Sequence, residues 1–372
     1  MEFDVLIFEH DVHKYPPILS IINFLKENKR KIIYIGCCYD NSLIKEIEEA
    51  GGIFYNIIDN DTSSSSLTKF LRLTSFKKKA QEILKKTGHD NIARVWLFGE
   101  TCIWLLGNLV FEYRCISYLF EMPHLQMTTK YRLLSPDLDY KKVLQSSYKV
   151  VCCEYNRAQI TRSYFKLMEL PVIIPNKPYF KNIEGNNLDV PPSLIGKKVI
   201  LYQGIFNYPE RKMDGLCETI THLSEDFVIC LMGSDNAYKD TLKKKYSNED
   251  RIIFLPYIKA PLHMEITKLA YIGFLSYYGE SGNIRNSLNT LYCAPNKIFE
   301  YSKFSIPMLS NDVPALSYLF DKYNSGLTSS EHASDLLAAI MEIDARYDEF
   351  SRGSEKLYNS VDLTKLYSKL IY

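Results

Sequence analysis

The stretch Ala294–Leu316, APNKIFEYSKFSIPMLSNDVPAL, decides the fold because it predicts a helix followed by a short buried strand. The apolar residues of its first half recur at helical spacing, and Pro307 ends the helix. A short apolar run follows and is closed by the turn-forming pair Asn311-Asp312. One acid, Glu300, lies inside the helix between two aromatic residues. A carboxylate in such surroundings needs hydrogen-bond partners.

The same alternation of strand and helix patterns precedes this stretch. Near-continuous apolar runs are typical of strands that are buried on both faces of a parallel sheet. The first half of the chain contains five of them: 3–8 (FDVLIF), 31–36 (KIIYIG), 94–98 (RVWLF), 115–120 (CISYLF) and 149–153 (KVVCC). Helical patterns lie between these runs. The order predicts an α/β fold with a doubly wound sheet.

The pattern breaks and then starts again. Residues 176–196 are rich in proline and contain Gly185-Asn186-Asn187, which is typical of a linker. New apolar runs follow at 198–202, 227–232, 252–255 and 272–276. We therefore predict two Rossmann-like doubly wound domains facing across a cleft. Their expected bounds are 1–175 (N-terminal domain), 176–196 (linker), 197–345 (C-terminal domain) and 346–372 (a helical tail that packs back on the first domain).

Composition excludes several classes of protein. Hydrophobic residues make up 46% and charged residues 24% of the 372 residues, which is typical of a globular chain. The net charge of +1 gives no indication of a nucleic-acid partner. The nine cysteines include no CxxC pair and no zinc-like spacing, and the N-terminus does not resemble a signal peptide. We expect a cytoplasmic protein, and the cysteine spacing gives no indication of a zinc site.

Three loops of the second half could carry chemistry, because ligands of such sheets bind beyond the carboxyl ends of the strands. The first, 203–214, has Gly204 for a tight turn and Arg211-Lys212 just before a helix, which suits a diphosphate. An exposed pair of bases without a ligand is the alternative. The second, at Gly233-Ser234, could hold a phosphate or a base edge, or be a plain turn.

The third loop, 277–295, is long and polar, and its residues with side chains suited to binding or catalysis are Glu280, Asn283 and Arg285. It leads into the helix that carries Glu300. We hypothesise that Glu300 accepts hydrogen bonds from the sugar hydroxyls of a bound nucleotide. A long loop without function is the alternative for 277–295.

Loops of the first half also carry candidate site residues. His10, Asp11 and His13 follow the first strand and could act as acid and base or bind a metal, although a polar loop is the commoner outcome. Glu121 and His124 follow the strand 115–120, and His124 could act as a base or be a structural histidine.

The helix expected at 67–86 is basic on much of its surface. Its bases could lie on an anionic membrane, which would make the protein peripheral at the inner face, or the helix could simply be solvated. The sequence contains no GxGxxG after the first strand, no GxxxxGK[ST] and no GxSxG. Those absences argue against a dehydrogenase, a P-loop NTPase and an α/β-hydrolase, respectively.

The motifs together resemble a GT-B glycosyltransferase, in particular the GT4-type (glycosyltransferase group 1) family, mainly over residues 198–326 and more weakly over the first half. Three segments carry the resemblance: LYQGIFNYPERKMDGL at 201–216, PVIIPNKP at 171–178 and PNKIFEYSKFSIPMLSND at 295–312. The last matches a family segment that contains Asn296 and Lys297 and in which the glutamate, here Glu300, holds the ribose of the nucleotide-sugar donor. The resemblance implies donor contacts at Gly204, Gly233 and Ser234, and no metal or cofactor.

Two departures from the family pattern bear on catalysis. Many relatives have a second glutamate eight residues before the first, and here that position is Tyr292. The family's Lys-Gly pair is Lys212-Met213. The donor sugar and the retention of configuration therefore stay open.

The resemblance implies a transferase that moves a hexosyl or N-acetylhexosaminyl group from a nucleotide-diphosphate sugar to a saccharide or lipid-linked saccharide, for surface polysaccharide or glycan synthesis. Arg211, Lys212, His124 and Glu121 would be its catalytic residues. The alternatives are a nucleotide-sugar epimerase of the same fold and a non-catalytic subunit that binds a nucleotide sugar. The nucleotide base, acceptor, linkage and oligomeric state are not predicted.

Overall fold

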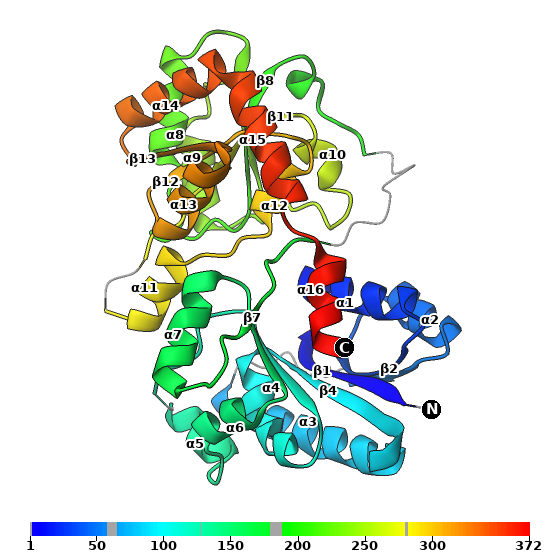
Figure 1. Ribbon diagram of the computed structural model, residues 1–372. Helices are drawn as coiled ribbons and strands as arrows, with labels where there is room; N and C mark the ends of the chain where they lie inside the picture. The colour runs from blue at the N-terminus through cyan, green and yellow to red at the C-terminus, as the bar shows by residue number, and fades with distance from the viewer. Residues whose placement is uncertain (1, 58–64, 127, 179–187, 280–281) are drawn as a thin grey trace. The chain divides into compact units, whose positions relative to one another are not determined.

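The chain folds into two compact α/β units. The computed structural model describes residues 2–57, 65–126, 128–178, 188–279 and 282–372 (Figure 1). The first unit comprises Met1–Tyr179 and Leu363–Tyr372, and the second comprises Phe180–Asp362. The predicted C-terminal tail is therefore divided, because its first helix belongs to the second unit and its last helix to the first.

A seven-stranded parallel sheet forms the first unit, in the order β3-β2-β1-β4-β5-β6-β7. Its strands are β1 (Phe3–Asp11), β2 (Lys31–Cys37), β3 (Ile53–Asn56), β4 (Ile92–Phe98), β5 (Cys115–Leu119), β6 (Lys149–Cys152) and β7 (Val172–Ile173). Its helices are α1 (Pro16–Glu27), α2 (Asn41–Glu49), α3 (Ser66–Thr87), α4 (Gly99–Leu106), α5 (Thr129–Leu134), α6 (Tyr140–Ser146), α7 (Tyr155–Phe165) and α16 (Leu363–Ile371).

Both faces of this sheet are covered by helices, which explains the continuous apolar runs of the sequence. Val5 and Ile7 of β1 pack with helices α3 and α4 in one core cluster. The C-terminal helix α16 lies beside α1, where the ring of Tyr367 is 5.3 Å from that of Phe24 (Figure 1). Arg94 on β4 donates to the carbonyl of Ile371 at 2.9 Å, so the last helix is fixed to the sheet by a buried hydrogen bond.

The second unit has a six-stranded parallel sheet in the order β10-β9-β8-β11-β12-β13. Its strands are β8 (Lys198–Gln203), β9 (Phe227–Met232), β10 (Ile252–Leu255), β11 (Ala270–Leu275), β12 (Met308–Asn311) and β13 (Gly326–Ser329). Its helices are α8 (Asp214–Glu218), α9 (Ala237–Lys245), α10 (Met264–Thr267), α11 (Ile284–Leu291), α12 (Lys297–Ser302), α13 (Pro314–Tyr323), α14 (Ala333–Ala345) and α15 (Tyr347–Asn359).

The six strands of the second sheet have the same order as the first six strands of the first sheet, and in both sheets the first strand of the unit lies between its second and fourth strands. This is the Rossmann order, and it confirms the predicted fold class of two doubly wound parallel sheets. Two details differ from the sequence expectation. The stretch 277–295 is not all loop, because α11 occupies Ile284–Leu291. The helix expected directly after Arg211-Lys212 is a short α8 followed by a 3-10 turn at Thr219–His222.

None of the helices in the described ranges combines the length and the apolar character that crossing a bilayer requires.

Candidate functional site

In the second unit, polar side chains gather where β8 and β11 end. These two strands are neighbours, but the chain leaves them toward opposite sides of the sheet, which is the position where open α/β sheets bind ligands. Gln203 ends β8, and Ser276 directly follows β11. Both side chains are buried, and both hydrogen-bond to residues that the sequence singled out.

Close packing of α12 on the sheet fixes the position of Glu300. A Cβ atom on Gly273 of β11 would lie 2.4 Å from the ring of Tyr301, so only glycine lets this ring approach the strand. The Tyr301 hydroxyl donates to the carbonyl of Leu201 on β8 at 2.8 Å. Glu300 is the preceding residue on the same short helix, and its side chain is consequently held at the end of β8.

The Glu300 carboxylate is 3% exposed and is held at one oxygen. Oε2 accepts hydrogen bonds from Gln203 Nε2 and from Lys297 Nζ, each at 2.8 Å. His263 Nε2 lies 3.3 Å from the same oxygen but without hydrogen-bond geometry. Within the described ranges, no residue donates a hydrogen bond to Oε1. Burial alone would raise the pKa of this carboxyl, but the charge of Lys297 and the adjacent His263 lower the pKa to about 2.

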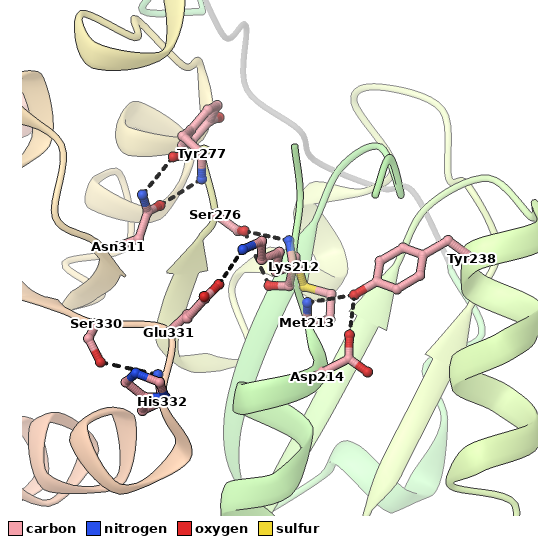
Figure 2. Close-up of polar contacts among 10 residues, drawn as sticks. All are labelled: Lys212, Met213, Asp214, Tyr238, Ser276, Tyr277, Asn311, Ser330, Glu331 and His332. Carbon is pink, nitrogen blue, oxygen red and sulfur yellow. Dashed lines mark hydrogen bonds and ion pairs between the residues drawn. The ribbon is translucent and has the colours of Figure 1, made fainter. Parts of the chain in front are cut away.

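Lys212 is held at both its backbone and its side chain (Figure 2). Its amide donates to Ser276 Oγ at 2.9 Å, and Ser276 Oγ donates back to its carbonyl at 3.2 Å. Its ammonium group pairs with Glu331 Oε2 at 2.5 Å and lies 4.6 Å from the ring centre of Tyr278. The predicted phosphate-binding lysine thus has a carboxylate as its partner in this structure.

Arg211, the other predicted base, lies against the start of the segment that follows β11. Its guanidinium carbon is 4.2 Å from the ring centre of Tyr277. Its Nη1 donates to the carbonyl of Glu210, and the same carbonyl accepts from the amide of Tyr278. Asn311 at the end of β12 bonds both the amide and the carbonyl of Tyr277 (Figure 2). Arg211, Lys212 and the β11 end therefore form one connected group.

A tyrosine from the next helix anchors the start of α8. The Tyr238 hydroxyl accepts from the amide of Met213 and donates to Asp214 Oδ2, both at 2.8 Å (Figure 2). On the far side of Lys212, the hydroxyl of Ser330 accepts from the amide of His332, which shapes the turn that presents Glu331.

The backbones of the two predicted glycines, Gly204 and Gly233, lie in close contact. A Cβ atom on Gly233 would lie 2.0 Å from the carbonyl oxygen of Gly204, so a side chain at this position would collide with backbone. Ser234 follows and is exposed. Lys239 is buried and donates to the carbonyls of Gly233 and Leu255, each at 2.7 Å. Its charge fixes the turn after β9.

Asn296 occupies the N-cap position of α12, but its side chain makes no capping hydrogen bond. The next residue, Lys297, is the ion-pair partner of Glu300. Asn283 caps α11 by accepting from the amides of Arg285 and Asn286. Glu280, which the sequence also made a candidate, lies outside the described residues.

In the first unit, the candidates His10 and Asp11 end β1, which is longer than the sequence predicted, and His13 follows it; each has a different partner. His10 Nε2 lies 3.4 Å from Glu9 Oε1, whereas His13 Nδ1 lies 3.5 Å from Asp40 Oδ2. Asp11 accepts from the amide of His13 and caps a 3-10 turn. The described part of the chain holds no group of three or more histidine, cysteine, aspartate and glutamate side chains that could hold a metal ion.

The histidine after β5 is held by a carboxylate. Glu100 accepts from the backbone amide of His124 through Oε1 and contacts His124 Nδ1 through Oε2, both at 2.5 Å. Because a carboxylate only accepts, Nδ1 is the donor, and a neutral ring would keep Nε2 free to accept a proton. Glu121 is mostly exposed and pairs with Arg157 at 3.1 Å. His124 and Glu121 thus do not pair with each other.

Sequence reasoning missed several residues that complete these groups. They are Glu100 as the partner of His124, and Gln203, His263, Thr267, Ser276 and Glu331 in the second unit. Gln203 and Ser276 could have been found, because each is a polar residue at the end of an apolar strand. Glu331 and His263 carry no such signal.

Comparisons with known proteins agree on the fold. No protein-family model matches the sequence, and no curated protein is similar to it in sequence. Among solved structures, Anabaena HepE in complex with UDP and glucose matches with a TM-score of 0.65 and 10% identity, over 100% of this chain and 98% of that one. Sucrose-phosphate synthase from Thermosynechococcus elongatus matches with a TM-score of 0.69 and 13% identity, over 100% and 96%.

A third match has a different activity in its description. It is a Listeria monocytogenes protein described as a UDP-N-acetylglucosamine 2-epimerase, with a TM-score of 0.61 and 12% identity, over 100% of this chain and 95% of that one. At these identities the likeness shows the fold. The chain has the GT-B fold of two Rossmann-like domains, as the sequence motifs predicted.

Proposed function

We propose that this chain is a glycosyltransferase that moves a sugar from a nucleotide-diphosphate sugar to a saccharide or lipid-linked saccharide acceptor. The observation that carries the proposal is the Glu300 carboxylate, which is buried, charged at neutral pH and held at Oε2 by Gln203 and Lys297. Oε1 accepts no hydrogen bond from the residues that the structure describes. The hydroxyls of a ribose would supply the missing donors.

Lys212 and Arg211 would hold the diphosphate of the donor. They are joined to the same β8 and β11 ends as Glu300 through Ser276 and Tyr277. Two fixed positive charges would stabilise the negative charge that develops on the leaving diphosphate, a contribution that is often the largest in such reactions. Under this proposal the transfer needs no metal ion and no cofactor. The backbone at Gly204, Gly233 and Ser234, together with Asn296, would complete the donor contacts.

The acceptor would bind to residues of the first unit. His124, oriented by Glu100, would take the proton of the acceptor hydroxyl through Nε2. Glu121, His10, Asp11 and His13 would contact the acceptor. We propose a hexosyl or N-acetylhexosaminyl group as the transferred sugar, in the synthesis of a surface polysaccharide or another glycan.

Helix α3 would bring the protein to an anionic lipid surface inside the cell. Its inward residues Leu73 and Phe76 are buried in the core, whereas Leu67 and Leu71 are exposed beside Lys69. Exposed apolar side chains next to bases favour the interface of an anionic bilayer. Sedimentation with phosphatidylglycerol vesicles tests this contact, which Leu71→Glu should weaken.

The donor assignment is tested by thermal stability with UDP, GDP, ADP and CMP and with their sugars. A ligand that binds only the folded state raises the melting temperature by mass action. Glu300→Gln should lower the affinity for the effective ligand by roughly ten- to hundredfold, because a hydrogen bond to a charged group contributes about 1.5–3 kcal/mol. Exposed Glu48→Gln is the matched control. The proposal fails if no nucleotide stabilises the wild-type protein.

An epimerase is the second candidate, because a protein described as an epimerase has the same fold over 100% of this chain and 95% of its own. Incubation with the nucleotide sugar alone separates the two reactions. An isomerised nucleotide sugar would support the epimerase, whereas transfer requires an acceptor. Tyr292, in place of the family's second glutamate, favours a third candidate, a non-catalytic subunit. Donor binding without nucleotide release, across a broad panel of acceptors, would support it.

A further inference from the structure

His263 is a buried histidine of the second unit to which the donor contacts proposed above give no role. It lies directly before α10, and its side chain is 9% exposed. Both ring nitrogens are buried and have no hydrogen-bond partner among the described residues. Native proteins rarely leave a buried polar group unpaired, so a ring with two such nitrogens requires an explanation.

One of the two nitrogens faces the carboxylate of the candidate ribose site. His263 Nε2 lies 3.3 Å from Glu300 Oε2. Because a carboxylate only accepts hydrogen bonds, the nitrogen that faces it carries a proton. This N–H is therefore a donor that is close to a charged acceptor and is not used by it in this structure.

The acceptor is already occupied. Gln203 Nε2 and Lys297 Nζ each donate to Glu300 Oε2 at 2.8 Å. One carboxylate oxygen offers about two lone pairs, so three N–H donors compete for two positions. The competition explains why His263 lies within reach of Oε2 without forming a hydrogen bond to it.

The three donors differ in how easily they can leave Oε2. Gln203 is buried, and Thr267 Oγ1 lies 2.8 Å from its carbonyl oxygen and 3.1 Å from the backbone carbonyl of His263, which fixes both residues. The Lys297 side chain is 27% exposed and ends a flexible four-carbon stem. Lys297 is therefore the donor that can leave Oε2 for a ligand.

We propose that His263 replaces Lys297 at Glu300 Oε2 when a nucleotide binds, so that Lys297 is released to contact the anionic diphosphate. A buried carboxylate that loses one donor without replacement is strongly destabilised. With His263 as the replacement, Glu300 keeps two donors in both states. The inference rests on the proposed function for the identity of the ligand, and it makes His263 a positioning residue that acts through Glu300 and Lys297.

The first test needs no ligand and follows the titration of Glu300 by NMR. In protein labelled with ¹³C-glutamate, Glu300→Gln assigns the carboxyl signal. The pKa of Glu300 is about 2 in the wild-type protein. It should stay below the usual glutamate range in Lys297→Met and in His263→Phe, because each donor replaces the other. In the double variant, burial should raise the pKa above that range.

The second test measures nucleotide affinity in two backgrounds by titration calorimetry. The probe is UDP, or whichever of GDP, ADP and CMP stabilises the wild-type protein. In the wild-type background, His263→Phe should raise the Kd about tenfold or more, because Lys297 then has to stay on Glu300. In the Lys297→Met background the same substitution should have almost no effect, since no lysine is left to release.

Two further variants serve as controls. The side-chain amide of His263→Gln can donate to Oε2 from the position of Nε2, so this variant should bind the nucleotide nearly as well as the wild-type protein. Lys268→Met removes an exposed lysine that directly follows α10 and pairs with Glu265. It should change neither the Glu300 titration nor the Kd.

Three results would overturn the proposal: a Glu300 pKa that rises in Lys297→Met alone, a loss of affinity from His263→Phe that is equal in both backgrounds, or a His263→Gln variant that binds as weakly as His263→Phe. Each can occur in a protein that binds the nucleotide. The proposed function fails instead if no nucleotide stabilises the wild-type protein, and the Glu300 titration then still decides whether His263 can take the place of Lys297.

Discussion

Gln203 at the end of β8 donates to Glu300 Oε2 at 2.8 Å, although the two residues are 97 positions apart in the sequence. The carbonyl oxygen of the same side-chain amide, Gln203 Oε1, accepts from Thr267 Oγ1 at 2.8 Å, and all three side chains are buried. The amide thus fixes which oxygen of Glu300 is occupied, and it leaves Oε1 available for the proposed contact with a ribose. A site whose first contact is oriented before binding loses less entropy when the ligand arrives.

The charge on Glu300 predicts a specific response to acid. Its pKa falls from 4.5 to about 2 on folding, so the folded state binds this proton less readily than the unfolded state. The stabilisation is complete above the unfolded value and is lost as the pH falls from about 4.5 to about 2, with a size of about 3 kcal/mol. Thermal unfolding at a series of pH values should show the advantage of the wild-type protein over Glu300→Gln shrinking in this window.

The exposed control Glu48→Gln should run parallel to the wild-type protein across the same pH range. A difference between wild type and Glu300→Gln that stays constant from about pH 6 to about pH 2 would mean that Glu300 is not held as a low-pKa carboxylate.

The pairing of Lys212 with Glu331 predicts opposite effects of the two side chains on donor binding. Lys212→Ala should weaken UDP binding about tenfold or more, because a charge-assisted bond to the diphosphate is lost. Glu331→Gln should strengthen it by a few-fold, since the Glu331 carboxylate, 44% exposed, competes with the diphosphate for the lysine. Titration calorimetry at low and high salt measures both, with exposed Lys244→Ala as the control.

If Glu331→Gln weakens UDP binding as much as Lys212→Ala does, Glu331 positions the lysine for the diphosphate and does not compete with it. The salt dependence distinguishes the two roles further. A competing carboxylate makes UDP binding less sensitive to salt than it is in the Glu331→Gln variant, because one unfavourable charge is removed by the substitution.

Local patterns in the sequence were sufficient to predict the strands and to single out Glu300 as a candidate site residue. Strands buried on both faces produce continuous apolar runs such as FDVLIF, and the segment around Glu300 combines a helix, an acid and a terminating proline within a few residues. The helix α11 was missed although Ile284, Leu288 and Leu291 have helical spacing, because the polar residues between them are equally typical of a loop.

The contacts of the site could not be predicted in the same way. Lys212 and Glu331 are 119 positions apart, and no periodicity in the sequence indicates that these two parts of the second unit meet. Glu331 reaches Lys212 because Gly215 lets α8 approach the backbone of Glu331, where a Cβ atom would lie 2.1 Å from its carbonyl oxygen. Such pairings depend on the packing of whole elements, which sequence spacing does not express.

The short contact between Glu100 and His124 predicts the tautomer of the histidine. In the neutral ring the proton should reside on Nδ1, because Glu100 accepts there at 2.5 Å. Nitrogen chemical shifts of ¹⁵N-histidine should show Nδ1–H for His124 and a mixture of tautomers in Glu100→Gln. Exposed His89 should be the same in both proteins. With an acceptor found, Glu100→Gln should lower kcat about tenfold or more and leave the donor KM unchanged.

A Glu100→Gln variant that keeps both the tautomer and the rate would assign a structural role to His124.

The buried pair of Arg94 and Asp4 predicts a large loss of stability when one partner is removed. Arg94 donates to Asp4 at 2.7 and 3.2 Å and to the carbonyl of Ile371, and it is 4% exposed. Arg94→Met should cost about 3–5 kcal/mol, because the carboxylate stays buried with fewer partners, and it should increase amide hydrogen exchange in α16. Arg346→Met, which breaks exposed pairs with Glu342 and Glu349, should cost less than about 1 kcal/mol. Equal losses in the two variants, or α16 amides that exchange as in the wild-type protein, would show that the buried pair does not hold the C-terminal helix.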